Sequence, residues 1–208
     1  MSAICTRATL ILLLATLTRA HVAPWAKGMY CLNGTSGTEN RNTNDAVQPL
    51  YRMQKSQWWM HHSNGCDQFP PSPGDFLEVP AGGSFTVEMA NNRGQTTLSY
   101  NGQYTSEWPD GKQHPEDFHI DTCITVPNIH TQNHTNAAGS AFAISYESEL
   151  SRVTAENLVV FSVLPNSPWK RLASFSVPSA LPACPQGGCI CVWGWVPNGC
   201  GYVITVTF

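Results

Sequence analysis

Charged residues are scarce in this sequence. Lysine, arginine, aspartate and glutamate make up 12% of the 208 residues, and the formal net charge is −3 at pH 7. A chain without a basic footprint has little to attract phosphate backbones or anionic lipid headgroups, so nucleic acid and membrane surfaces are not expected partners. The 16 glycines and 15 prolines are instead typical of a β protein with many turns.

A long hydrophobic run is also absent. The apolar stretch "ATLILLLATL" at residues 8–17 is about half the length that a membrane-spanning helix needs. Arg7 precedes it, and the small residues Thr18 and Ala20 follow it. This order predicts a signal peptide over residues 1–20, and hence a secreted chain that begins at His21. Residues 21–208 are then expected to form one domain.

Helical periodicity is scarce too, and only residues 45–62 have room for a helix. Elsewhere, short runs alternate apolar and polar residues, as Phe85, Val87 and Met89 do, and turn signals separate these runs. The pattern predicts an antiparallel β-sandwich, of the immunoglobulin or fibronectin III kind, with long decorated loops. The expected strands are 84–90, 96–102, 140–147, 157–164, 170–177, 189–196 and 202–208.

The cysteines do not come in an even number. Cys5 falls inside the expected signal peptide, and an oxidising compartment pairs the thiols of a secreted chain, so one of the others is expected to lack a partner. The crowded cysteines at 184–200 have no histidine at zinc-finger spacing, which disfavours zinc. The disulfide candidates are Cys31, Cys66, Cys123, Cys184, Cys189, Cys191 and Cys200.

A histidine at the start of a chain has chemistry that no internal histidine has. The α-amino group of His21 and its ring Nδ1 can close a six-membered chelate ring on one ion. A second imidazole would complete a T-shaped set of three nitrogens, which suits Cu(II). The α-amino group has a pKa of about 7.7–8.0, so copper must displace its proton. The alternative is that His21 is a frayed terminus with no role.

Several long segments of the sequence resemble those of one protein family. "HVAPWAKGMYCLNGT", "QWWMHH", "GDFLEVPAGGSFTVE", "AAGSAFAISYESELSRVTAENLVVFSV" and "LPACPQGGCICVWGWVPNGCG" are similar to the lytic polysaccharide monooxygenases of auxiliary activity family 14, which are secreted fungal copper proteins. The similarity runs from residue 21 to about residue 201. It implies one copper ion held by a histidine brace on a β-sandwich.

The resemblance also implies the ligands. His21 maps onto the family's first histidine, and His130, ahead of the strand "SAFAISY", maps onto the second. His119 is the next candidate for that second position. The other histidines are expected to pack, to line the substrate face or to lie on the surface: His61, His62, His114 and His134.

The match departs from the family near the carboxyl end. After "WVPNGCG" the family continues into a segment with an axial tyrosine and a final cysteine, whereas this chain reads "YVITVTF". Tyr202 is the tyrosine available for the axial position, and its alternative is an ordinary strand residue. One of Cys184, Cys189 and Cys191 is expected to have lost its partner.

N-glycosylation is expected at two sequons, "NGT" at Asn33 and "NHT" at Asn133. Asn133 stands close to His130 in the sequence. A glycan there is expected to point away from the metal, although it would otherwise mark the edge of a docking face.

The implied activity is oxidative. An external electron donor reduces the copper, dioxygen or hydrogen peroxide is the co-substrate, and a sugar C–H bond beside the glycosidic bond of xylan on cellulose is oxidised. Glu116 and Asp117 are neighbours in sequence and do not form the pair of carboxyl groups that a hydrolase needs. A monomer is expected. The alternatives are a secreted copper-binding protein without turnover and an inactive truncated form.

Overall fold

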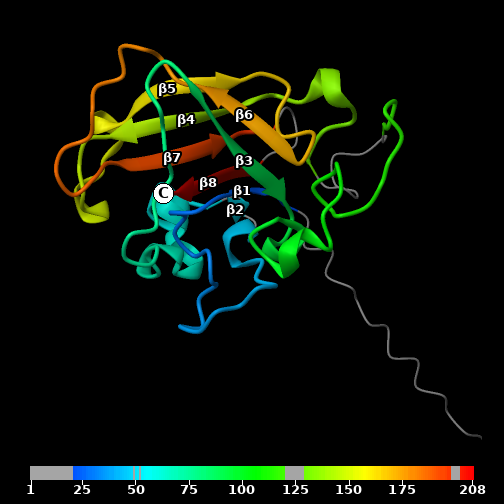
Figure 1. Cartoon of the computed structure of the whole chain (residues 1–208), viewed down its shortest axis with the longest axis horizontal. Coiled ribbons are helices and arrows are strands. Elements are labelled where there is room, and N and C mark those ends of the chain that lie inside the picture. Colours follow the sequence, from blue (N-terminus) through cyan, green and yellow to red (C-terminus); the bar gives the residue numbers. More distant parts are fainter. Residues whose placement is uncertain (1–20, 49, 52, 120–128, 198–201) are drawn as a thin grey trace, which may run out of the picture.

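The chain folds into two antiparallel sheets that pack face to face (Figure 1). The computed structural model describes residues 21–48, 50–51, 53–119, 129–197 and 202–208. One sheet has the order β1-β3-β6 and the other the order β2-β8-β7-β4-β5. The strands are β1 (Ala23–Trp25), β2 (Leu50–Tyr51), β3 (Ser84–Ala90), β4 (Ser140–Ser145), β5 (Val159–Leu164), β6 (Leu172–Ser176), β7 (Ile190–Trp195) and β8 (Tyr202–Thr207).

The expected antiparallel β-sandwich is therefore confirmed, while its assignment to the immunoglobulin or fibronectin III kind stays a prediction. The two layers meet along one side, where β5 lies against β6, and again where β1 lies against β8. Residues 1–20, which include the expected signal peptide, lie outside the described residues.

A cluster of phenylalanines fills the space between the sheets. Phe142 of β4 is fully buried and meets the rings of Phe85 on β3 and Phe175 on β6 edge to face, with centroids 4.9 and 4.8 Å apart. Phe208 adds a fourth ring, 5.5 Å from Phe142. Because alternate strand residues point to opposite faces, these apolar positions all come from one face of each strand.

One of the expected strands is wrong. Residues 96–102 do not pair with a neighbouring strand, but follow the 3-10 turn η4 (Arg93–Gln95) and end in the turn η5 (Tyr100–Gly102). The carboxylate of Glu88 accepts the backbone N–H of Thr97, which replaces a ladder hydrogen bond. Asn101 and Gly102 are left-handed, with φ of 53° and 74°, and this conformation does not continue a strand.

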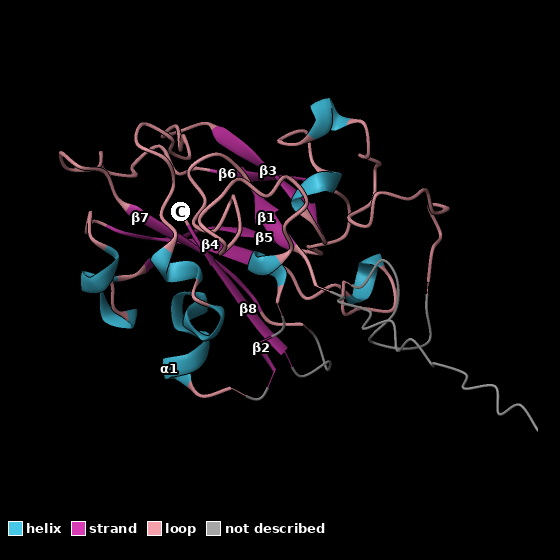
Figure 2. Ribbon diagram, turned by 90° about the horizontal axis from the view of Figure 1, so that it is seen from below, coloured by secondary structure: helices cyan, strands magenta, loops and turns pink. Residues whose placement is uncertain are grey.

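The one expected helical region is broken into short pieces. Within residues 45–62, the helix α1 spans only Lys55–Trp58, and Figure 2 shows it beside the paired strands β2 and β8. Met60 and His61 have φ of 49° and 58°, so the α-helix cannot continue through them. The remaining 3-10 turns are η1 (Asp45–Val47), η2 (Trp59–Asn64), η3 (Cys66–Gln68), η6 (His134–Asn136), η7 (Leu150–Arg152) and η8 (Ala155–Asn157).

Helices are thus short throughout the part of the chain that the structure describes. None of them is long and apolar enough to cross a membrane.

Candidate metal centre

The fold brings His21 and His130 together at one end of the sandwich. His21 lies directly before β1, and His130 follows the start of the described segment 129–197. Their ring centroids are 4.5 Å apart and the ring planes are tilted by 41°. His21 is 5% exposed and His130 is 1% exposed. The two histidines that the family resemblance selects are therefore neighbours in space.

The tryptophan at the end of β7 packs against one ring of this histidine pair. Trp195 is buried, and its ring meets that of His130 nearly edge on, with centroids 5.6 Å apart and an angle of 64° between planes. His130 itself has a φ of 47°, in the left-handed region that few residues other than glycine adopt. Unusual backbone conformations of this kind concentrate at functional sites.

The surroundings of His21 keep its imidazole neutral. Burial, and after it the neighbouring His130 and His61, lower the pKa of His21 to about 3. Burial acts because a charged ring loses its hydration, and the two other imidazoles act because a positive charge would be repelled. A neutral ring keeps its nitrogen lone pair available, which metal ligation requires.

His61 is the residue of this centre that sequence reasoning did not place. It is 2% exposed and lies close enough to His21 to act on its pKa. Its neighbour His62 is exposed instead, with Nδ1 2.7 Å from Asp67 Oδ2. The doubled histidine in "QWWMHH" was a signal, but the bend at Met60 and His61 decides which ring turns inward.

The other histidines have different surroundings. His119, the second choice for the ligand, is exposed at the edge of the described segment 53–119. His114 lies with Nε2 3.0 Å from Asp110 Oδ2 and with its ring edge on to Trp108. His134 is exposed and lies 5.7 Å, ring to ring, from Trp169.

The donor set fits a copper ion. His21 and His130 supply two buried imidazoles, one of them held neutral, and the α-amino group of His21 becomes a third nitrogen in a chain that starts there. Nitrogen donors of this kind suit Cu(II). Within the described ranges, no group of three or more His, Cys, Asp or Glu side chains is spaced to hold a metal ion. The backbone of Tyr202 pairs with Tyr51, and its side chain lies outside the described part of the chain.

The cysteines within the described residues are divided between two disulfide bridges and one buried thiol. Cys31 pairs with Cys66 and Cys184 with Cys189, whereas Cys191 is free. Burial raises the pKa of the Cys191 thiol to about 12. Cys123 and Cys200 lie outside the described residues.

Both sequon asparagines use their side-chain oxygens inside the fold. Asn33 Oδ1 accepts a hydrogen bond from Arg93 Nη1 at 2.6 Å, and Asn133 Oδ1 caps η6 by accepting the backbone N–H of Asn136 at 2.9 Å. Asn33 is exposed and Asn133 half-buried.

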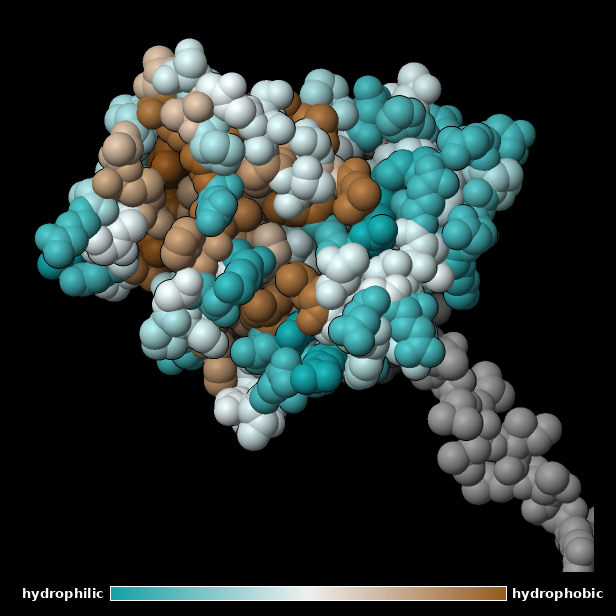
Figure 3. All heavy atoms as spheres, viewed as in Figure 1, coloured by the Kyte–Doolittle hydropathy of each residue, from teal (hydrophilic) through white to brown (hydrophobic). Residues whose placement is uncertain are grey.

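A separate apolar groove opens at the other end of the sandwich. It has a volume of about 600 Å³, and Phe76, Leu181 and Phe208 are among its walls. Figure 3 shows hydrophobic surface gathered on the left of that view, near the position of the C-terminus in Figure 1. The groove reaches Cys191, which pairs with Ile144, whereas the His130 contact is at Trp195, which pairs with Ser140. It is therefore not part of the metal centre.

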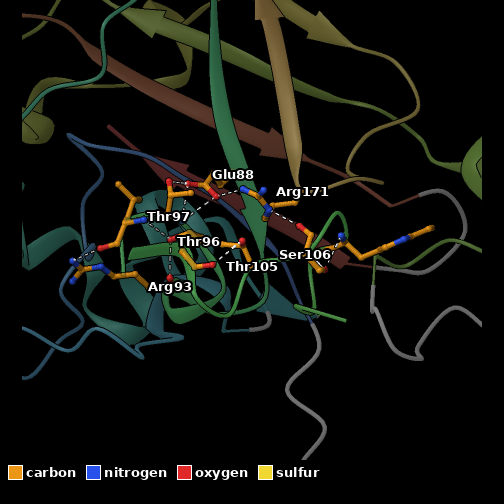
Figure 4. Close-up of polar contacts among 10 residues, drawn as sticks. Glu88, Arg93, Thr96, Thr97, Thr105, Ser106 and Arg171 are labelled. Carbon is orange, nitrogen blue, oxygen red and sulfur yellow. Dashed lines mark hydrogen bonds and ion pairs between the residues drawn. The ribbon is translucent and has the colours of Figure 1, made fainter. Parts of the chain in front are cut away.

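A buried ionic network fixes the segment after β3 to the sheets (Figure 4). The Glu88 carboxylate accepts hydrogen bonds from Thr97 and from Arg171 Nη1, and Arg171 Nε donates to the backbone oxygen of Ser106 at 2.6 Å. Arg93 Nη2 donates to the backbone oxygen of Leu98 at 3.2 Å. These contacts tie residues 93–107 to Glu88 of β3 and to Arg171, which directly precedes β6.

The β-sandwich and its buried histidine pair together define a class, the proteins in which two antiparallel sheets bring a pair of histidines together at one end. The family model "Lytic polysaccharide monooxygenase AA14" matches residues 1–205. The chain belongs to this family.

Three relatives show how much of the family's length is present. AA14 family lytic polysaccharide monooxygenase B of Trametes coccinea (strain BRFM310) is 38% identical over 182 residues, which are 86% of this chain and 40% of the relative. The B protein of Pycnoporus cinnabarinus is 37% identical over 182 residues, 86% of this chain and 45% of the relative. The A protein of Trametes coccinea is 34% identical over 189 residues, 90% and 41% respectively. The chain thus spans less than half the length of these relatives.

Proposed function

We propose that this chain is a secreted, copper-dependent polysaccharide monooxygenase that cleaves plant cell-wall polysaccharide oxidatively, with xylan associated with cellulose as its substrate. The observation that carries the proposal is the buried His21–His130 pair, with ring centroids 4.5 Å apart. Membership of the AA14 family supports the same chemistry.

Each residue has a distinct part in this function. The α-amino group and Nδ1 of His21, with the ring of His130, would hold copper, and Tyr202 is the candidate for a further ligand. When bound, copper supplies the one-electron chemistry that turns dioxygen or hydrogen peroxide into an oxidant for a sugar C–H bond. Trp195 orients the ring of His130 by packing against it, and burial keeps the ring of His21 unprotonated.

The proposal requires removal of residues 1–20. With Ala20 attached, the nitrogen of His21 is an amide, which lacks the basic lone pair of an amine. Export and cleavage after Ala20 would therefore create the third copper ligand. The remaining domain, residues 21–208, would act as a monomer with an external electron donor.

The test compares two forms of the chain 21–208, one with a free α-amino group on His21 and one in which that amino group is acetylated. Electron paramagnetic resonance of Cu(II) should show a nitrogen-rich axial spectrum for the first form only. Xylan-coated cellulose treated with the first form, copper and ascorbate should release oxidised oligosaccharides, which mass spectrometry detects. Identical spectra for the two forms would contradict the proposal.

A third result has its own meaning. If the His21 form binds copper as expected and releases no oxidised products, the chain is a copper-binding protein without turnover. Electron donor and co-substrate are checked by leaving out ascorbate, or by replacing dioxygen with hydrogen peroxide under argon.

A further inference from the structure

Two tyrosines on the segment after β3 are open to solvent. Tyr100 is 39% exposed and Tyr104 is 53% exposed, and their rings meet edge to face with centroids 5.4 Å apart. Aromatic rings are among the side chains that gain most from being covered, because each presents a large apolar face. A pair of them left open is therefore available to a ligand.

The backbone presents these rings in a defined position. Tyr100, Asn101 and Gly102 have φ of 50°, 53° and 74°, and left-handed φ is costly for the two residues that are not glycine. Hydrogen bonds close the turn: Gln103 N donates to Tyr100 O at 3.1 Å, and Thr105 Oγ1 donates to Gly102 O at 2.9 Å. The surrounding structure thus holds a strained turn, as it does at many binding sites.

Both ends of this segment are tied to the sheets. Figure 4 shows Glu88 engaging Thr97 on one side and Arg171 engaging Ser106 on the other. A rigid support lowers the entropy that a ligand must overcome on binding, because the contact groups are already in place.

A polar hollow adjoins Tyr100. Its volume is about 530 Å³, and its other walls carry hydroxyl, amide, carboxylate and guanidinium groups. Glu39 pairs with two guanidinium groups, with Oε2 3.3 Å from Arg41 Nε and Oε1 3.1 Å from Arg93 Nη2. These groups and the neighbouring hydroxyls and amides can donate hydrogen bonds to sugar hydroxyls and accept hydrogen bonds from them. The lining residues besides Tyr100 are Ser36, Thr38, Glu39, Asn40 and Arg41.

The segment that carries the tyrosines begins at the end of the sandwich where His21 lies. Ala90, at the end of β3, pairs with Ala23, at the start of β1, and His21 comes just before Ala23. Figure 1 shows the green segment that follows β3 beside the start of the blue β1. The segment that carries the tyrosines therefore leaves β3 beside the strand that His21 leads into.

We propose that Tyr100 and Tyr104, together with this hollow, form a binding subsite for a neutral polysaccharide chain. The rings stack on the C–H faces of sugar units, and the polar walls bond to the hydroxyls of the same or the next unit. The inference rests on the proposed function for its ligand class alone, since neither tyrosine is assigned a part in copper binding.

The test measures binding of the metal-free mature chain to phosphoric-acid-swollen cellulose and to insoluble xylan by depletion from solution. The double variant Tyr100→Ala with Tyr104→Ala should bind about tenfold more weakly, the combined loss of two aromatic contacts. Tyr104→Phe keeps the ring and should bind like the unchanged chain. The matched control is Tyr146→Ala, because Tyr146 is an exposed tyrosine that follows β4 at its other end.

Equal binding of the double variant and the unchanged chain overturns the inference, as does an equal loss in Tyr146→Ala. If the double variant does not fold, nitration of the unchanged chain replaces it: xylohexaose or cellohexaose should protect Tyr100 and Tyr104 more than Tyr146, and uniform nitration overturns the inference. If the double variant binds polysaccharide as well as the unchanged chain does and oxidised products are still released, the subsite is wrong and the proposed function stands. If the double variant binds more weakly while the unchanged chain releases no oxidised products, the subsite stands and the proposed function is wrong.

Discussion

The imidazole rings of His21 and His130 lie 4.5 Å apart although they belong to opposite layers of the sandwich. His21 leads into β1 of the three-stranded sheet, whereas His130 packs on Trp195 of the five-stranded sheet. Their meeting depends on the tertiary fold and on no local contact. A metal site formed in this way should respond sharply to the loss of either ring.

Replacing His130 should therefore remove high-affinity copper binding. In His130→Ala, the ion keeps only the chelate of His21 and gains a water ligand, so the nitrogen coupling in the electron paramagnetic resonance spectrum should decrease. The matched control is His119→Ala, since His119 is an exposed histidine of the neighbouring loop. Unchanged copper affinity in His130→Ala, with a normal circular dichroism spectrum, would exclude His130 as a ligand.

Loss of the Glu88 carboxylate should destabilise the domain. Glu88 and Arg171 form a buried ion pair, with side chains 11% and 14% exposed, and Glu88→Ala leaves the guanidinium without its counter-charge. Breaking a buried pair from one side costs about 3–5 kcal/mol of unfolding free energy, which urea denaturation measures. Asp75→Asn removes an ion pair in which the Lys27 side chain is 66% exposed, and it should leave the urea midpoint nearly unchanged. Equal midpoints for both variants would contradict the network's role.

The thiol of Cys191 should resist alkylation in the folded chain. Its pKa is raised to about 12, so at pH 8 only about one molecule in ten thousand carries the reactive thiolate. Raising the pH from 7 to 9 should therefore produce little labelling by iodoacetamide, whereas denaturant should allow it at once. Peptide mass spectrometry locates the label, and Cys191→Ala serves as the control. Prompt labelling of Cys191 without denaturant would show that the thiol is accessible.

Truncation of the central core ring should cost far more than truncation on the outer face. Phe142→Ala removes a ring that contacts Phe85, Phe175 and Phe208, and should lower the unfolding free energy by about 3–5 kcal/mol. Val163→Ala changes a β5 residue that is 64% exposed, and its effect should stay below about 1 kcal/mol. Thermal unfolding of both variants measures the contrast. Comparable losses would mean that the phenylalanine cluster does not carry the core.

Local alternation was sufficient to predict the strands at 84–90, 140–147, 157–164, 170–177, 189–196 and 202–208, because residues at every second position of a strand point to the same face. The segment 96–102 has the same alternation, yet its backbone donor at Thr97 goes to a carboxylate from β3. That partner is distant in sequence, so the pattern could not reveal it.

The candidate site, too, could be predicted only in part. The cleavage pattern before His21 and the family resemblance for His130 led to two residues that the fold brings together. The approach of His61 could not be predicted, because it depends on two consecutive left-handed residues, Met60 and His61, that turn one imidazole of a pair inward. Sequence periodicity contains no information on such a bend.

The attachment of the two imidazoles to separate layers has a mechanical consequence. A copper ion bound by both rings would cross-link the two sheets at the edge strand β1, which is only three residues long. A chelator would then remove the cofactor and also the link between this short edge strand and the opposite sheet. In the metal-free protein, β1 should unfold locally before the rest of the domain. The backbone amides of Val22 and Ala23 should then exchange with solvent faster than they do in the copper-loaded protein.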